Sequence, residues 1–313
     1  MTVTVEILRE VILQHVPVMS AEIVDYIDPS PGDTIVDATI GCGGHARPIL
    51  ERVRPTGRVI GIDQDKDALE CAKENLKEFS DSLFLVNENF RNLDQILKTL
   101  EIEKIDGIVF DLGISSLQID TPDRGFSIKH SAPLDMRMNR AGRVSAFELV
   151  NNLPLEEISR ILKEYGEERF HAAIARAIIE RRRRSQITTT GELAEIVVGA
   201  QRGHKFYKIH PATRTFQAFR IAVNDEIESF RQALTACAKY LAPGARVCVL
   251  SYHSIEDRVA KQVLRDFERE DTLKRLTKKP SRPSQTELSQ NPRSRSAKLR
   301  VAEKGLKEGS QTA

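Results

Sequence analysis

A short apolar run that ends in an acid and continues into glycines is the feature that most constrains this chain. The run Thr34–Asp37 has the composition of a buried β-strand, and Gly41, Gly43 and Gly44 follow it closely. Glycine lacks a Cβ, so it permits sharp turns and lets a ligand come near the backbone. With Ala46, these glycines fit the G-x-G-x-x-G/A pattern, in which the next helix points its first amides at a nucleotide. The pattern predicts a Rossmann-like nucleotide crevice without saying which nucleotide it binds, and an ordinary strand–turn–helix junction could look the same.

Further apolar runs repeat this strand pattern along the chain, and segments with helical spacing separate most of them. Alternation of strands and helices is the mark of an α/β fold with a largely parallel sheet. We therefore predict a sheet built from the first run and four more, with a final edge strand near the C-terminus. The additional strands are Gly57–Asp63, Leu83–Val86, Ile105–Asp111, Ala245–Tyr252 and, at the edge, Ala297–Ala302.

The alternation stops after the fourth strand and returns near residue 209. Between them, the stretch from Ser145 to Gly203 shows apolar residues at helical spacing only. We interpret residues 121–208 as an inserted all-helical domain. Residues 1–120 and 209–313 then form one discontinuous α/β domain, in which Pro211 begins a single long helix through Leu241.

Composition narrows the class of protein. The chain has 313 residues, of which 40% are hydrophobic and 29% charged, as expected for a soluble protein with a real core. No apolar run approaches the roughly 18 residues of a membrane-spanning helix, and the N-terminus lacks signal-peptide features. The cysteines, Cys42, Cys71, Cys237 and Cys248, are scattered without metal-ligand spacing. We therefore expect a cytoplasmic protein with reduced cysteines, no disulfide, no resident metal and no membrane contact.

Acids end several of the predicted strands at the edge where open α/β sheets bind ligands. Asp63 lies about 20 residues beyond Gly41, which is the usual distance for a carboxylate that accepts hydrogen bonds from ribose hydroxyls. Asp37 and Asp111 end two other strands. Phe90, after the third strand, is placed to cover an adenine ring, although a core aromatic under a loop fits its composition equally well. The crevice is therefore predicted to bind an adenosine-like ligand.

The segment from Asp111 to Ser116 bears on which chemistry this crevice supports. An exocyclic amine on a nucleobase is a weak nucleophile, because its lone pair is delocalised into the ring. A short polar segment facing a methyl donor can hold the N–H groups and orient that lone pair. The segment favours amine methylation. The glycines and Asp63 alone would also fit a nicotinamide-dependent oxidoreductase.

Longer motifs extend over nearly the whole chain: His15–Val18, Gly41–His45, Asp111–Ser116, Asp123–Ser127, Leu134–Met138, Gly166–Phe170, His210–Gln217, His253–Arg258 and Asn291–Arg300. In these motifs and in their order, the chain resembles the bacterial 16S rRNA (cytosine-N4)-methyltransferase family, of the MraW or RsmH type. Leu117 departs from the resemblance, because the family usually has Pro at that position.

The resemblance implies a Rossmann-like class I S-adenosylmethionine-dependent methyltransferase sheet, with the helical insertion recognising substrate. It implies S-adenosylmethionine as methyl donor and, as acceptor, the N4 amine of cytosine 1402 of 16S rRNA, near the P site of the small ribosomal subunit. A non-catalytic ribosome-assembly factor that keeps this fold as a scaffold is an alternative. Carried over by motif, the donor-binding residues are Gly43, Gly44, His45, Asp63, Phe90, Asp111 and Gln118.

The resemblance says less about which residues catalyse the transfer. Our hypothesis is that Asp111, Ser115 and Ser116 orient the amine, together with Ser251 and His253 near the end of the neighbouring strand. No separate general base is required, because the sulfonium is a good leaving group and the proton can pass to water afterwards.

The basic C-terminal segment suits an RNA partner. From residue 274 to residue 307 there are eleven Lys or Arg residues against two Glu. Such clusters form the electrostatic footprint of nucleic-acid-binding proteins. The sequence does not determine the oligomeric state, and a homodimer is one possible arrangement. The residues predicted to contact RNA are Arg137, Arg214, Arg220, Arg293, Arg295 and Lys298.

Overall fold

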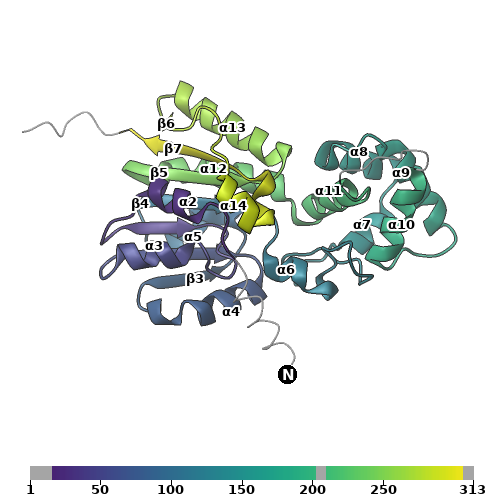
Figure 1. The fold of residues 1–313 in the computed structure, drawn as a ribbon, viewed down its shortest axis with the longest axis horizontal. Coiled ribbons are helices and arrows are strands. Elements are labelled where there is room, and N and C mark those ends of the chain that lie inside the picture. Colours follow the sequence, from purple (N-terminus) through teal and green to yellow (C-terminus); the bar gives the residue numbers. More distant parts are fainter. Residues whose placement is uncertain (1–15, 202–208, 306–313) are drawn as a thin grey trace, which may run out of the picture. The chain divides into compact units, whose positions relative to one another are not determined.

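The computed structural model describes residues 16–201 and 209–305, which divide into two compact units (Figure 1). Unit 1 contains the chain up to Ser115 and from Ile227 onward, and unit 2 spans Ser116–Glu226. His15, part of the first family motif, falls outside the described residues. The functional division at residues 120 and 209 stays a prediction.

Unit 1 is built on a seven-stranded sheet in the order β3-β2-β1-β4-β5-β7-β6. Neighbours from β3 to β5 are parallel, whereas β7 runs antiparallel to both β5 and β6. This confirms the predicted α/β sheet. The strands are β1 Thr34–Asp37, β2 Arg58–Asp63, β3 Leu83–Asn87, β4 Ile105–Asp111, β5 Leu241–Ser251, β6 Leu273–Arg275 and β7 Lys298–Lys304.

Two apolar clusters cover the two faces of this sheet. Successive side chains of a strand point to opposite faces, so Ile35 lies in one cluster and Val36 in the other. Helices with apolar residues at helical spacing complete both clusters. One face is covered by α2 Ser20–Ile27, α3 Ala46–Val53 and α4 Lys66–Asn75, and the other by α5 Leu93–Thr99, α12 Glu226–Tyr240 and α13 Ser254–Arg269.

The point at which the strand order reverses lies between β1 and β4. Asp37 in β1 pairs in register with Val109 in β4. From β1 the chain continues to β2 on one side, whereas β4 is bordered by β5 on the other. Open α/β sheets bind ligands beside the carboxyl ends of strands at such a reversal. The fold therefore predicts that a ligand binds next to Asp37 and Asp111.

Unit 2 is helical over nearly all of its regular structure. In α8 the buried residues Ile158, Ile161 and Leu162 recur at helical spacing and form the apolar face. A Cβ on Gly166 would lie 2.7 Å from the Arg214 carbonyl oxygen, so glycine is needed where α8 meets α11. Across residues 16–201 and 209–305, no helix is long and apolar enough to cross a membrane. The elements are α6 Ser116–Asp120, η3 Pro122–Arg124, α7 Ala146–Asn152, α8 Leu155–Gly166, α9 His171–Arg182, α10 Thr190–Ala200 and α11 Thr213–Asn224.

The structure corrects three expectations about the C-terminal half. The single long helix is wrong, because Asp225 takes a left-handed conformation (φ 48°) and separates α11 from α12. The fifth strand does not begin at Ala245, because β5 already starts at Leu241 and contains Pro243. The last strand, β7, is not an edge strand, because β6 pairs with its outer side.

Candidate active site

The glycine loop after β1 is fixed by contacts with the protein itself. Gly41 and Gly43 have φ angles of 52° and 88°, which disfavour residues with a Cβ. A Cβ on Gly43 would lie 2.5 Å from the Leu76 side chain, and one on Gly44 would lie 2.7 Å from Pro17. The sequence suggested that these glycines admit a ligand. In the structure, positive φ and close packing already require them.

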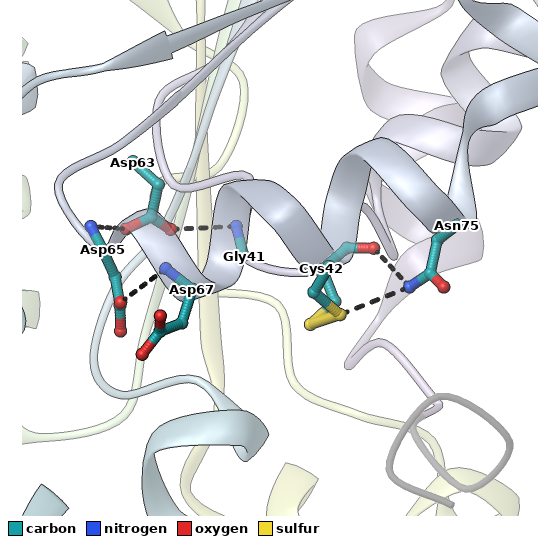
Figure 2. The surroundings of a disulfide bond; sticks show 7 residues. Gly41, Cys42, Asp63, Asp65, Asp67 and Asn75 are labelled. Carbon is teal, nitrogen blue, oxygen red and sulfur yellow. Dashed lines mark hydrogen bonds between the residues drawn. A yellow bond between two sulfur atoms is a disulfide. The ribbon is translucent and has the colours of Figure 1, made fainter. Parts of the chain in front are cut away.

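Asp63, at the end of β2, is the centre of a backbone-anchored carboxylate site (Figure 2). Its Oδ2 accepts a hydrogen bond from the Gly41 amide at 3.0 Å, and its Oδ1 accepts one from the Asp65 amide at 2.9 Å. Burial raises the pKa of Asp63 to about 7, although the two amides act to lower it. Each carboxylate oxygen has a second lone pair. Asp63 can therefore also accept hydrogen bonds from the hydroxyls of a ribose.

Asp111, at the end of β4, lies between two polar side chains. Its Oδ1 accepts a hydrogen bond from the Tyr252 hydroxyl at 2.8 Å, and its Oδ2 lies 3.3 Å from Nε2 of His45. Its amide donates to Oγ1 of Thr39. Burial acts to lower the pKa of His45, but the carboxylates of Asp111 and Asp37 outweigh burial and leave that pKa raised. The cluster thus combines Asp37 and Asp111 with a histidine whose raised pKa favours its protonated form.

Asp37, at the end of β1, is almost fully buried. Its Oδ1 accepts a hydrogen bond from the Thr39 amide at 3.1 Å, but its Oδ2 has no hydrogen-bond partner among the described residues. Burial raises the pKa of Asp37 to about 6. A buried polar atom without a partner is costly, so such an atom often marks the place of a ligand. A ligand that carries positive charge or N–H donors would fit this position.

The structure gives direct support to one of the two roles predicted for Phe90. Its ring packs edge-to-face on Phe110, with the ring centroids 6.1 Å apart, and it borders the core cluster of one sheet face. It is nevertheless only partly buried, at the carboxyl edge just beyond β3. The adenine contact remains a prediction, and the alternative of a core aromatic has direct packing support.

The polar residues after β4 are divided between the two units. Ser115 is the last residue of unit 1, whereas Ser116 and Gln118 belong to α6 in unit 2, where both are buried. Their contacts with a donor or an acceptor base therefore stay predictions.

Ser251 and His253 serve the fold in this structure. Ser251 donates to the Lys298 carbonyl oxygen in β7 at 3.3 Å. His253 caps α13, since its Nδ1 accepts from the Glu256 amide at 3.3 Å and its Nε2 lies 3.1 Å from Glu256 Oε1. A catalytic role for His253 stays a prediction.

Sequence reasoning missed the contribution of Tyr252 and Thr39 to this site. Tyr252 closes the predicted fifth strand and directly precedes His253, so its position at the strand end was a usable signal. Thr39 carried no such signal, because a threonine after a strand is common in turns. Asp37 was identified as a strand-end acid but was not assigned to the site.

The expectation of reduced cysteines is wrong for one pair. Cys42, in the glycine loop, and Cys71, in α4, form a disulfide with their Cα atoms 5.0 Å apart (Figure 2). Local sequence patterns do not indicate this closeness, because 29 residues separate the pair. The parallel pairing of β1 with β2 brings the segments that follow them together. Cys237 and Cys248 are free, buried thiols.

The fold and this site define a class of protein. Five parallel strands and an antiparallel β7 in this order, with an acid at the end of β2, are the architecture of class I S-adenosylmethionine-dependent methyltransferases. The donor carries an ammonium and a sulfonium, and Asp37 and Asp111 supply negative charge beside the reversal point. Asp63 suits its ribose. The residues present therefore fit S-adenosylmethionine, which is the methyl donor of this enzyme class.

Comparison with known proteins identifies the family. The model of the MraW methylase family matches residues 12–305, and the chain belongs to that family. A relative from Geotalea uraniireducens (strain Rf4) is 45% identical, over 93% of this chain and 98% of its own length. Relatives from Halothermothrix orenii and Brevibacillus brevis are 43% and 44% identical, over 94% and 93% of this chain and 99% and 98% of their own lengths. All three are named ribosomal RNA small subunit methyltransferase H. Membership in a methylase family excludes the nicotinamide alternative.

Proposed function

We propose that this enzyme methylates the exocyclic N4 amine of cytosine 1402 in 16S rRNA, within the small ribosomal subunit. Two findings support the proposal. The relatives described above are named for methylation of small-subunit rRNA. The chain also contains the long motifs of the (cytosine-N4)-methyltransferase resemblance, from the glycine loop to the basic C-terminal segment. We place this activity in the cytoplasm, where ribosomal subunits are found.

The Asp111 cluster is the observation that carries the proposal. S-adenosylmethionine supplies an electrophilic methyl group on a sulfonium. The chain must hold the amine in line with it and must orient the nitrogen lone pair. Asp111 stands at the reversal point, and the Tyr252 hydroxyl and the His45 ring border its two carboxylate oxygens. We infer that this fixed carboxylate binds an N–H group of either the donor or the base.

The remaining site residues would hold the donor. We propose that Asp63 accepts from the ribose hydroxyls, because its carboxylate is already fixed by two backbone amides. Asp37 has an oxygen without a partner in the described part of the chain, which suits a donor N–H group or positive charge. The amine proton would leave to water, so none of these groups needs to act as a dedicated base.

The arginines predicted to bind RNA fall into two groups. Arg214 in unit 2 and Arg293 and Arg295 in unit 1 have exposed side chains. By contrast, Arg137 donates twice to Asp135, and Arg220 donates to both oxygens of Glu226.

Lys298 resembles the second group, because its Nζ lies 3.3 Å from Asp257. A phosphate would have to compete with these carboxylates. We therefore propose that the exposed side chains of Arg214 in unit 2 and of Arg293 and Arg295 in unit 1 make direct phosphate contacts, whereas Arg137 and Arg220 support unit 2 and Lys298 supports unit 1.

A methyl-transfer assay tests the proposed function. Small subunits from a strain that lacks the modification are incubated with the enzyme and S-adenosylmethionine bearing a radiolabelled methyl group. The labelled nucleotide is then mapped by nuclease digestion and mass spectrometry. We expect N4-methylcytosine at position 1402, and no incorporation into subunits that already carry the modification.

Two outcomes would overturn the proposal in different ways. Incorporation at another nucleotide would contradict the site but keep the activity. No incorporation into subunits, into assembly intermediates or into naked 16S rRNA would favour the non-catalytic assembly factor.

A further inference from the structure

The disulfide between Cys42 and Cys71 ties the glycine loop to α4 directly beside the candidate donor site (Figure 2). Its Cα separation of 5.0 Å is ordinary for a disulfide. Cys42 immediately follows Gly41, whose amide donates to the Asp63 carboxylate. The bonding state of the two sulfurs therefore acts on the loop that positions Asp63.

A second contact from α4 holds the same loop. Asn75 Nδ2 donates to the Cys42 carbonyl oxygen at 2.9 Å and lies 3.6 Å from Cys71 Sγ (Figure 2). Arg47, from α3, in turn donates to the Asn75 carbonyl oxygen. Because this anchor does not depend on the sulfurs, breaking the disulfide would loosen the loop without releasing it. The expected effect on ligand binding is graded.

The four cysteines differ in how well a thiol reagent can reach them. Cys42 is only partly buried, whereas Cys71 is buried behind it. Cys237 and Cys248 are fully buried. Burial also raises the pKa of Cys237 to about 12 and that of Cys248 further still, so neither forms a reactive thiolate near neutral pH. An incoming reagent would therefore meet Cys42 first.

We propose that Cys42 and Cys71 form a reversible dithiol–disulfide site that tunes the affinity of the enzyme for S-adenosylmethionine. The proposal rests on the proposed function, because that function places the chain in the cytoplasm. There thiols are kept reduced, and a disulfide is typically transient or redox-sensing. The two sulfurs join the glycine loop to α4, so a change in their redox state acts on the loop beside the donor site.

The exchange chemistry balances with a small or protein disulfide as oxidant. The Cys42 thiolate attacks one sulfur of the oxidant, the oxidant's S–S bond breaks, and one thiol is released. The Cys71 thiolate then attacks Cys42 Sγ in the mixed disulfide, which forms the intramolecular bond and releases the second thiol. Two electrons and two protons pass from the enzyme to the oxidant. A reducing thiol reverses both steps.

The oxidised state should bind the donor more tightly. With the disulfide formed, the loop carrying Gly41 is held close to its binding conformation, so less ordering is required when the donor arrives. Reduction leaves the Asn75 anchor from α4 in place. We expect the dissociation constant for S-adenosylmethionine to rise by about fivefold on reduction, as is reasonable for one lost loop constraint.

Calorimetric titration of the full chain with S-adenosylmethionine tests this expectation. The protein is first equilibrated with glutathione disulfide or with a phosphine reductant, and free thiols are counted in each sample after denaturation, which exposes Cys237 and Cys248. The four cysteines should give two free thiols after oxidation and four after reduction. Peptide mass spectrometry should identify Cys42 joined to Cys71. No RNA is present, so the result does not depend on whether the rRNA substrate is correctly assigned.

Variants separate the site from general effects of the reagents. Cys42→Ser and Cys71→Ala should both bind like the reduced wild type under either condition, and thermal melting checks that they fold. Cys237→Ala, which removes a buried thiol elsewhere, should keep the full difference. Equal affinities in the two redox states, despite the change in thiol count, would overturn the proposal. Four free thiols after oxidation would do so as well.

Discussion

Two stretches of the sheet's carboxyl edge differ in whether their polar groups are already hydrogen-bonded within the protein. Beside β1 and β2, Asp37 has an oxygen without a partner in the described chain, and burial raises the pKa of Asp63 to about 7. Beside β5, Ser251 bonds to β7, and His253 and Glu256 cap α13. The first stretch keeps hydrogen-bonding capacity for a ligand, whereas the second uses its capacity to hold the fold. Substitutions should therefore affect donor binding in the first stretch and stability in the second.

The largest effect should follow removal of the Asp63 carboxylate. Asp63→Ala would remove the acceptor for the ribose hydroxyls and the anchor for the Gly41 amide. Hydrogen bonds to a charged group are each worth about 1.5–3 kcal/mol. We expect the dissociation constant for S-adenosylmethionine to rise about 100-fold in calorimetric titration. Asp67→Ala, an exposed acid in the first turn of α4, is the matched control and should bind normally. Wild-type affinity in Asp63→Ala would contradict the assignment of donor binding to the stretch beside β1 and β2.

The next effect concerns stability rather than affinity. The pKa of Asp37 is raised from 3.8 to about 6 in the folded protein, so the folded state holds this proton more tightly than the unfolded chain. Stability from Asp37 is therefore present below about pH 4 and is lost as the pH rises through 6. Asn at this position has no such proton to lose.

Denaturant unfolding of Asp37→Asn and the wild type at pH 5 and pH 8 measures the contribution of Asp37 to the free energy of unfolding. Relative to the wild type, the variant should gain about 1.5 kcal/mol of unfolding free energy between the two pH values, at about 1.4 kcal/mol per pKa unit. Asp37→Asn should also bind the donor more weakly than the wild type does, because the substitution removes the buried charge. Asp67→Asn, at an exposed position, should show no such pH-dependent gain. An equal difference at both pH values would mean that Asp37 does not titrate in this range.

The features of the fold that could be predicted from the sequence are those set by residues close together in the chain. The parallel strands were recognisable because each is an apolar run, and β1, β2 and β4 end in an acid. The strand β6 was not, because Leu273–Arg275 is too short for a pattern. The break between α11 and α12 was hidden as well, because Asp225 interrupts a helix by its backbone conformation and leaves the apolar periodicity intact.

The site shows the same limit. Asp63 and Asp111 were predictable, since their place at a strand end follows from local sequence. The contact of Tyr252 with Asp111 joins residues 141 apart in the chain, and the disulfide joins residues 29 apart. Such pairs depend on how the strands are ordered. Likewise, nothing local distinguished His253 as a helix cap from His253 as a catalytic residue.

The second stretch of the sheet edge is tested at His253. His253→Ala removes the side-chain cap of α13, which should cost about 1 kcal/mol and lower the melting temperature by roughly 2 °C. The affinity for S-adenosylmethionine should not change. His253→Asn is the decisive partner, because asparagine is a good cap without an imidazole. If methyl transfer persists in both variants and His253→Asn restores the melting temperature, the residue acts as a cap; if methyl transfer is lost in both variants, the imidazole takes part in catalysis.

An effect of similar size should come from Tyr252, which follows β5 and donates a hydrogen bond to Asp111 at the end of β4. Burial and the neighbouring Asp111 raise the pKa of Tyr252, so its hydroxyl remains a donor throughout the working pH range. Tyr252→Phe removes this hydrogen bond while leaving the ring in place, at a cost of about 1 kcal/mol, or roughly fivefold in kcat/KM. A rise in the donor dissociation constant alone would mean that Asp111 binds the donor. A fall in kcat with unchanged donor binding would mean that Asp111 orients the base, so this one hydroxyl separates the two roles.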